Sequence, residues 1–340
     1  MATAEATGGA GVLGPPAATV AIPTFDGAKR IGQLLTALAA QSVESGAAFE
    51  VVVVDNASTD DTGRIAREHP ATGELCRHGV PLRVVHEGRP GLTYARIRGV
   101  LEATAPVVCF LDDDTIPGER YVQDGIQVFS DPKVGVAVSH VFPDYESSPP
   151  PAIARREHLF GINRHLGVSP RVWKPEDGIA PTLGAGLWVR REAFLNAVPW
   201  SEPEQLLPDR LGETLLSGGD IEIGFLIGRA GHLRTYRPEL RLAHRVLARR
   251  FDTQYVCRLI VGIMRSAATL DRKYARRGQE RAPGRATSLA RLLFAVAASP
   301  VIAAVRRDGA RDALFTLAAA WAGVQGPYRL RVRAARGGRS

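Results

Sequence analysis

The first half of the chain repeats one pattern, in which a short run of apolar, largely β-branched residues precedes a segment with apolar residues at helical spacing. Such runs predict strands that are buried on both faces of a sheet. The expected strands cover residues 18–22, 50–54, 81–86, 107–111 and 134–138. Because strands and helices that alternate in units of about thirty residues favour right-handed β-α-β crossovers, we predict an α/β fold with a mostly parallel, Rossmann-like sheet.

Three consecutive aspartates, Asp112, Asp113 and Asp114, follow the expected strand at 107–111. Adjacent carboxylates repel one another, and a divalent cation relieves this repulsion; oxygen ligands suit Mg²⁺ or Mn²⁺. Ligands of open α/β sheets bind where the strands end. We therefore predict a divalent-metal site at this edge. The alternative is that the aspartates only mark the N-terminus of a helix that begins near Pro117.

The second half of the chain changes character. Residues 141–182 contain seven prolines, which preclude long regular elements, so we expect a long connection that crosses a cleft. Regular structure should return with a strand over residues 184–189 and a helix that has Asp220 as its N-cap. One more short strand is expected at 233–236, followed by a helix over 251–270.

The length of 340 residues allows one large α/β domain with an extension. We expect a disordered tail over residues 1–16 and a main domain over 17–250. Within this domain, residues 17–140 should form a nucleotide-binding half. Residues 141–250 should form a second half, which the family resemblance given below identifies as the acceptor half. Residues 251–340 should form a basic, helical C-terminal extension.

The net charge of +8 comes largely from arginines late in the chain. Such a charge can serve nucleic acid, anionic lipid or phosphorylated substrates. The sequence has no nucleic-acid-binding module and no interleaving of basic with aromatic residues, so nucleic acid is not an expected partner. Three scattered cysteines fit a reducing cytoplasm, and the first residues lack the pattern of a signal peptide. We expect a cytoplasmic protein, either free or peripheral at the inner face of the plasma membrane.

Two apolar runs in the extension, residues 289–305 and 313–324, are each shorter than the ~20 clean apolar residues that a spanning helix needs. Two interpretations stay open. The runs could form an interfacial helical pair that touches an anionic membrane surface, or a plain helical cap that packs on the domain.

Four motifs, in the order in which they occur, resemble those of family 2 glycosyltransferases, which are inverting enzymes with the GT-A fold. They are residues 21–24 (Ala-Ile-Pro-Thr), residues 54–60 (Val-Asp-Asn-Ala-Ser-Thr-Asp), residues 110–117 (Phe-Leu-Asp-Asp-Asp-Thr-Ile-Pro), and the set Gly184-Ala185-Gly186, Arg190–Phe194 and Gly219-Asp220. The resemblance spans residues 18 to 250. It implies metal-dependent transfer of a sugar from a nucleotide-diphosphate donor, with a UDP-sugar expected, to a hydroxyl group. The acceptor could be a glycan, a lipid-linked acceptor or a small molecule. The expected setting is the assembly of exopolysaccharide or cell-envelope glycan.

The resemblance also implies roles for individual residues. It implies nucleotide binding by Pro23, Thr24, Asp55, Arg96, Asp112 and Asp113, metal contacts by Asp114 and His244, an acceptor-side position for Gly184, Ala185 and Gly186, and the catalytic base at Asp220. Without the resemblance, Asp55 would be a residue that stabilises its own turn, Arg96 a surface arginine and Asp220 a helix cap. Arg249 and Arg250 are further candidate contacts for the diphosphate.

A base at Asp220 suits inversion, because in a single displacement the acceptor hydroxyl must lose its proton while it attacks the anomeric carbon. The family more often has Glu-Asp where this chain has Gly219-Asp220. The missing Glu leaves open how the base is oriented or how the acceptor is held. Glu222 could compensate only if the geometry allows it.

Two other functions remain open on the sequence. A sugar-1-phosphate nucleotidyltransferase would need a Gly-rich, Arg-containing phosphate loop after the first strand, which residues 22–27 do not supply. A nucleotide-sugar-binding protein without catalysis is suggested by Gly219, whereas the presence of Asp114 and Asp220 favours an enzyme.

Overall fold

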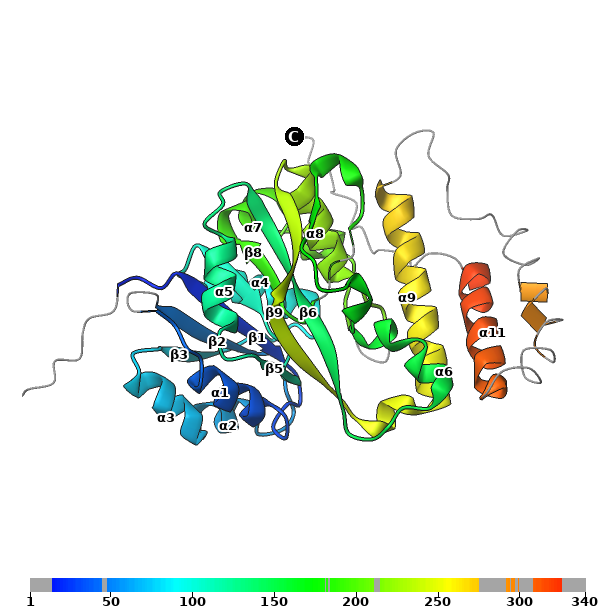
Figure 1. Cartoon of the computed structure of the whole chain (residues 1–340), viewed down its shortest axis with the longest axis horizontal. Coiled ribbons are helices and arrows are strands. Elements are labelled where there is room, and N and C mark those ends of the chain that lie inside the picture. The colour runs from blue at the N-terminus through cyan, green and yellow to red at the C-terminus, as the bar shows by residue number, and fades with distance from the viewer. Residues whose placement is uncertain are drawn as a thin grey trace, which may run out of the picture.

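A computed structural model describes residues 14–44, 48–180, 182, 184–210, 215–274, 292–293, 295–296, 299 and 308–325 (Figure 1). One nine-stranded sheet runs through it in the order β3-β2-β1-β4-β8-β6-β9-β5, and β7 also pairs with β9. The strands are β1 (Ala18–Thr24), β2 (Phe49–Asp55), β3 (Leu82–His86), β4 (Val107–Phe110), β5 (Thr115–Pro117), β6 (Val134–Tyr145), β7 (Arg171–Trp173), β8 (Leu187–Arg190) and β9 (Leu233–Val246). The predicted α/β class is confirmed.

The first four strands in sequence form the parallel half of the sheet. β1 pairs in parallel with β2 and β4, and β2 pairs in parallel with β3. The helices between and after them are α1 (Ile31–Ala39), α2 (Thr62–Glu68), α3 (Pro70–Arg77), α4 (Leu92–Glu102) and α5 (Tyr121–Val128). Thr24 is in register with Asp55, and β4 runs alongside in the same direction. The predicted polar residues at the strand ends therefore meet at one edge of the sheet.

The other half of the sheet is mixed. β8 is antiparallel to β4 and β6, whereas β6 and β9 run parallel over almost their whole length. Both strands are longer than the sequence predicted. In β9 the ladder skips Pro238–Leu240, between Arg237 opposite Ser139 and Arg241 opposite His140, and continues beyond this irregularity. β8 pairs only with Val136–Val138 of β6, so Pro143 lies where β6 has a partner on one side alone. The connection predicted to start at residue 141 starts after Tyr145 instead.

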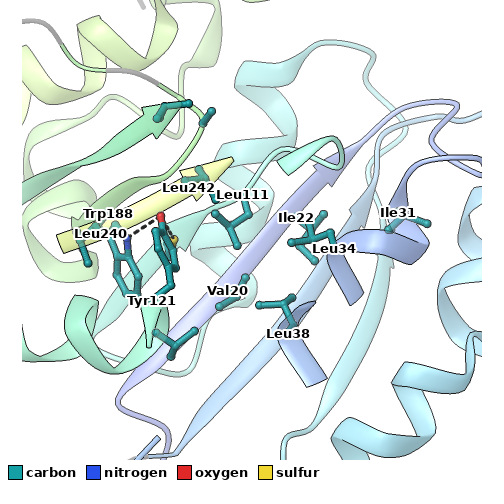
Figure 2. Close-up of a cluster of buried hydrophobic side chains, with 14 of the residues drawn as sticks. Val20, Ile22, Ile31, Leu34, Leu38, Leu111, Tyr121, Trp188, Leu240 and Leu242 are labelled. Carbon is teal, nitrogen blue, oxygen red and sulfur yellow. Dashed lines mark hydrogen bonds between the residues drawn. The ribbon is translucent and has the colours of Figure 1, made fainter. Parts of the chain in front are cut away.

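The main core lies between the sheet and α1 and α5. Val20 and Ile22 of β1 face Leu34 and Leu38 of α1, as Figure 2 shows, and all four are buried. Burying side chains of this size contributes roughly 1.5–3 kcal/mol each. In the neighbouring part of the core, Trp188 of β8 donates from Nε1 to the hydroxyl of Tyr121, over 3.1 Å.

The described part of the C-terminal extension consists mainly of α9 (Thr253–Tyr274) and α11 (Gly309–Gln325). The two helices lie side by side at the end of the molecule opposite α1–α3 (Figure 1). α11 is anchored by buried Asp312, which forms ion pairs with Arg155 and Arg156 next to α6 (Pro151–Ala154). The described helices α9 and α11 therefore pack on the domain.

None of the helices in the described ranges is long and apolar enough to cross a membrane. Most of the apolar run 289–305 lies outside the described residues, as do residues 1–13 of the expected tail and residues 326–340. Two helices complete the second half of the domain, α7 (Arg191–Ala197) and α8 (Gly219–Arg229).

Candidate active site

Two adjoining cavities open at the carboxyl edge of the parallel strands. The larger has a volume of ≈ 400 Å³ and is lined by strand-end residues that include Pro23, Thr24 and Asn56, by residues 90–92 at the start of α4, and by all three aspartates 112–114. The smaller, of ≈ 190 Å³, contains Arg96, Asp209 and Asp220. Six residues line both: Leu92, Asp112, Arg210, His244, Arg250 and Tyr255. We call the larger the donor cavity and the smaller the acceptor cavity.

Asp113 is fully engaged by protein groups. Arg30 donates to both of its carboxylate oxygens, from Nε over 2.8 Å and from Nη2 over 2.9 Å, and the hydroxyl of Thr24 donates to Oδ2 over 2.6 Å. Gly27 allows this arrangement, because a Cβ there would lie 2.4 Å from Asp113 Oδ2. Asp113 therefore ties β1 to the acidic turn and leaves Asp112 and Asp114 to face ligands.

Asp114 forms the second polar cluster of the turn. Its Oδ1 lies 3.2 Å from His244 Nε2, and its Oδ2 accepts from Arg250 Nη2 over 2.9 Å. Burial opposes the charge of this carboxylate, but His244 and Arg250 outweigh that effect and hold its pKa well below the usual range. His244 reaches Asp114 because β9 pairs with β5, in which Thr115 stands opposite His244.

Asp114 and His244 supply part of the ligand set that a divalent cation needs. In the described portion of the chain, no three His, Cys, Asp or Glu side chains are grouped as a complete metal site. Mg²⁺ and Mn²⁺ sites at diphosphates, however, use one or two protein ligands and take the rest from water and phosphate. Neighbouring ligands of an octahedral ion with ~2.1 Å bonds lie roughly 3 Å apart, close to the separation of Asp114 and His244. Within the described ranges, the buried Nδ1 of His244 has no hydrogen-bond partner, but it lies across the ring from Nε2, the atom that faces Asp114.

Asp220 lies in the acceptor cavity, in the first turn of α8. Burial raises its pKa to about 6, although the charge of Arg96 opposes the shift; the negative charge of Asp209 adds to it. A carboxylate with this pKa is ionised at neutral pH and more basic than an exposed aspartate. The predicted N-cap role is wrong, since Gly218 occupies the N-cap with φ +137°, a conformation that favours glycine.

The Gly184–Gly186 segment lets the chain pass close to this cluster. A Cβ on Gly184 would lie 2.0 Å from Arg96 Nη2 and 3.2 Å from Asp220 Oδ2. Gly186 has φ +75°, and a side chain there would meet Ser139. Gly184 and Ala185 line the same cavity as Asp220, and the acceptor-side role of Gly184, Ala185 and Gly186 stays a prediction.

Two expected nucleotide contacts lie elsewhere. The Asp55 carboxylate accepts from the backbone N–H of Ser58 over 3.2 Å and so supports its own turn, while the next residue, Asn56, lines the donor cavity. Arg96 is buried in the acceptor cavity and donates to Asp209 over 2.9 Å. Glu222, the possible compensation for Gly219, is also turned away: its carboxylate is held by Lys273 and Tyr274 of α9.

The sequence did not point to Arg30, Asn56 or Asp209. Asn56 could have been found, because it stands at a strand end beside Asp55. Arg30 and Asp209 carry no local signal, since each meets its partner across more than eighty residues of sequence.

A cavity of nucleotide size at the carboxyl edge of parallel strands, next to a buried carboxylate with a raised pKa, is the usual arrangement of a ligand-binding site in an open α/β sheet. The mannosyltransferase PcManGT of Pyrobaculum calidifontis, solved with GDP-Man and Mn²⁺, has the same fold: the TM-score is 0.57 at 18% identity, over 91% of this chain and 87% of that one. Residues 19–194 match the family described as glycosyl transferase family 2. The chain belongs to this family and is a glycosyltransferase.

Curated relatives agree with this assignment. The glycosyltransferase AglE of Haloferax volcanii is 24% identical over 229 residues, which is 67% of each chain. The validoxylamine A glucosyltransferase of Streptomyces hygroscopicus subsp. jinggangensis is 32% identical over 121 residues, 34% of this chain and 26% of the relative. Because the enzyme class is shown, the non-catalytic alternative and the nucleotidyltransferase alternative are both set aside.

Proposed function

We propose that the protein is a divalent-metal-dependent, inverting glycosyltransferase that moves a sugar from a nucleotide-diphosphate donor to an acceptor hydroxyl. One observation carries the proposal: the base candidate Asp220 and the candidate metal ligand Asp114 face two cavities that meet at Asp112 and His244. An in-line displacement needs this arrangement, with the base on one side of the anomeric carbon and the leaving group on the other.

The donor cavity is the proposed nucleotide site. Pro23, Thr24, Asn56 and the turn at Gly91 form its wall, and Asp112 lies at its junction with the acceptor cavity, where a ribose or the transferred sugar would bind. We propose a UDP-sugar as the first donor to test; the solved relative PcManGT binds GDP-Man, so GDP-sugars belong in the same screen. Asp55 acts indirectly, by fixing the turn that places Asn56.

Asp114 and His244 would hold Mn²⁺ or Mg²⁺, and the bound metal would neutralise the charge that develops on the leaving diphosphate. Arg250 lies 2.9 Å from Asp114 and lines both cavities, so its guanidinium is placed to contact the diphosphate as well. Arg30 holds Asp113, which keeps the acidic turn in place.

On the acceptor side, Asp220 would take the proton of the attacking hydroxyl as the bond to the anomeric carbon forms. Gly184 and Ala185 line the cavity in which that hydroxyl would bind, and Gly184 lets the backbone pass close to Arg96 and Asp220. α9 supplies Leu259 and Ile263 to the opposite wall, so the C-terminal extension is part of the acceptor site. An acceptor with an apolar face next to its hydroxyl would suit this cavity: a glycan, a lipid-linked glycan or a small molecule.

We further propose that the enzyme works in exopolysaccharide or cell-envelope glycan assembly, in the cytoplasm or at the inner membrane face. The basic, apolar extension supports this proposal. Vesicle co-sedimentation with and without anionic lipid tests it, and equal recovery of the protein in both pellets would contradict a role for anionic lipid.

The transfer activity itself is tested by a screen. UDP-, GDP- and TDP-sugars are each incubated with a panel of p-nitrophenyl glycosides and Mn²⁺, and nucleoside diphosphate release is measured with and without EDTA. We expect one donor to give acceptor-dependent, EDTA-sensitive release with an inverted product anomer. Release that is unaffected by EDTA would contradict the metal-dependent mechanism, and a retained anomer would contradict the single displacement.

A further inference from the structure

Asp209 lies outside every motif that the chain shares with its family, yet it is among the most buried charged residues of the site, with 2% exposure. The segment around it is held from two sides. On one side, Leu92 donates its backbone N–H to the Asp209 carbonyl over 3.0 Å, and Thr93 donates to the Leu207 carbonyl over 3.0 Å. On the other, Glu222 of α8 accepts from the Leu207 N–H over 2.5 Å. These contacts fix the backbone around Asp209 relative to both α4 and α8.

The two oxygens of this carboxylate differ. Oδ2 accepts from Arg96 Nη1 over 2.9 Å. Oδ1 is buried and has no hydrogen-bond partner among the residues that the structure describes, and Asp209 lines the acceptor cavity. An unpaired carboxylate oxygen in a buried site is costly unless a ligand group donates to it. An acceptor hydroxyl is such a group.

Asp209 also lies beside position 219, where the family more often has Glu. A Cβ built on Gly219 would lie 3.2 Å from Thr93 Oγ1 and 3.3 Å from both Asp209 Cβ and Asp209 Oδ2. Asp209 and Thr93 thus border the space into which an acidic side chain at position 219 would project. Arg96 is fully buried among Asp209, Asp220 and Asp112, so without Asp209 it would lose its only direct salt-bridge partner among the described residues.

From these contacts we infer that Asp209 supplies the second acidic group of the acceptor site in place of a residue at position 219: it pairs with Arg96 through Oδ2 and receives a hydroxyl of the acceptor at Oδ1. The inference rests on the proposed function. It assigns Asp209 to acceptor binding and leaves proton abstraction to Asp220.

The test is to move the carboxylate between the two positions. Asp209→Asn keeps the shape of the side chain, Asp209→Ala removes it, and Gly219→Glu in the Asp209→Ala background returns an acid from α8. Gly219→Gln in the same background is the control, with the same size and no charge. Transfer is measured with the donor and the p-nitrophenyl glycoside that the screen selects.

We expect Asp209→Asn to raise the KM for the acceptor at least tenfold, with the KM for the donor within twofold of wild type. Asp209→Ala/Gly219→Glu should recover acceptor KM to within about fivefold of wild type, and the Gln control should not. An unchanged acceptor KM in Asp209→Asn, or equal recovery by Glu and Gln, would overturn the inference.

Failure of the proposed function is recognised separately, because the wild type would then transfer no sugar. Thermal unfolding decides the Arg96 pairing in that case. Asp209→Ala should melt about 5 °C or more below the wild type, since it leaves Arg96 buried without its partner, and Gly219→Glu but not Gly219→Gln should restore the melting temperature. Equal melting of all variants would overturn the pairing.

Discussion

Replacing Asp220 by asparagine should abolish transfer and, at the same time, stabilise the fold at neutral pH. The side chain is 8% exposed, and burial raises its pKa from 3.8 to about 6. An acid with a raised folded-state pKa binds its proton more tightly in the folded than in the unfolded protein. Its ionisation therefore costs stability, and this cost is absent below pH ~4, grows as the pH rises towards 6, and is complete above pH ~7.

The expected gain in the free energy of unfolding follows from the pKa shift of Asp220. At 1.36 kcal/mol for each pKa unit, a shift from 3.8 to about 6 corresponds to about 3 kcal/mol at pH 8. Asp220→Asn should gain a stability of this order at pH 8 and nothing at pH 4. The same change removes the base, which typically contributes 10²–10⁴-fold to the rate.

Urea denaturation at pH 4 and pH 8 measures the stability, and nucleoside diphosphate release measures the transfer. Asp271→Asn, an exposed aspartate on α9, is the matched control. In the wild type, kcat/KM should fall about tenfold between pH 7 and pH 5, because a base with a pKa of about 6 is mostly protonated at pH 5. Wild-type transfer by Asp220→Asn would refute the base, and lower stability of this variant at pH 8 would refute the burial reasoning.

Three further changes test other parts of the structure. Asp114→Ala should remove the gain in nucleotide affinity that Mn²⁺ provides, while Asp124→Ala on α5, outside the cavities, should not; calorimetry distinguishes them. Gly184→Ala should lower kcat/KM at least tenfold, because its Cβ would lie 2.0 Å from Arg96 Nη2, and unchanged kinetics would contradict the close approach. Asp312→Asn should lower the free energy of unfolding, measured by urea denaturation, by about 3 kcal/mol. This is the low end for breaking a buried ion pair, because Arg155 is 41% exposed. A loss below ~0.5 kcal/mol would show that α11 is not anchored there.

The parallel half of the fold could be predicted because its strands are buried on both faces and so read as unbroken apolar runs. The acidic turn was visible for the same reason: Asp112–Asp114 interrupt such a run abruptly. β5 was not predictable, since it has three residues and depends on pairing with β9 from the far end of the domain. The length of β6 was underestimated because Pro143 suggests a break that the one-sided pairing does not require. The length of β9 was underestimated because the ladder skips Pro238–Leu240 and resumes at Arg241.

Asp114 and Asp220 line the two cavities at the sheet edge, and their roles in metal binding and catalysis stay predictions. Arg96 was placed by its motif in the nucleotide pocket, whereas its buried partner is Asp209, 113 residues away in sequence. A pair so distant in sequence cannot be predicted from the local sequence around either residue. The absence of an acid at position 219 is visible in the sequence, whereas the closeness of Asp209 to Gly219 is visible only in the structure.

A calorimetric titration of the purified protein with UDP, GDP and TDP, each with and without Mn²⁺, tests the central claim most directly. We predict that one nucleotide binds in a metal-dependent manner and that Asp114→Ala loses the metal dependence. A folded protein that binds none of the three, with or without Mn²⁺, would contradict the assignment of the donor cavity and of the metal site at Asp114 and His244.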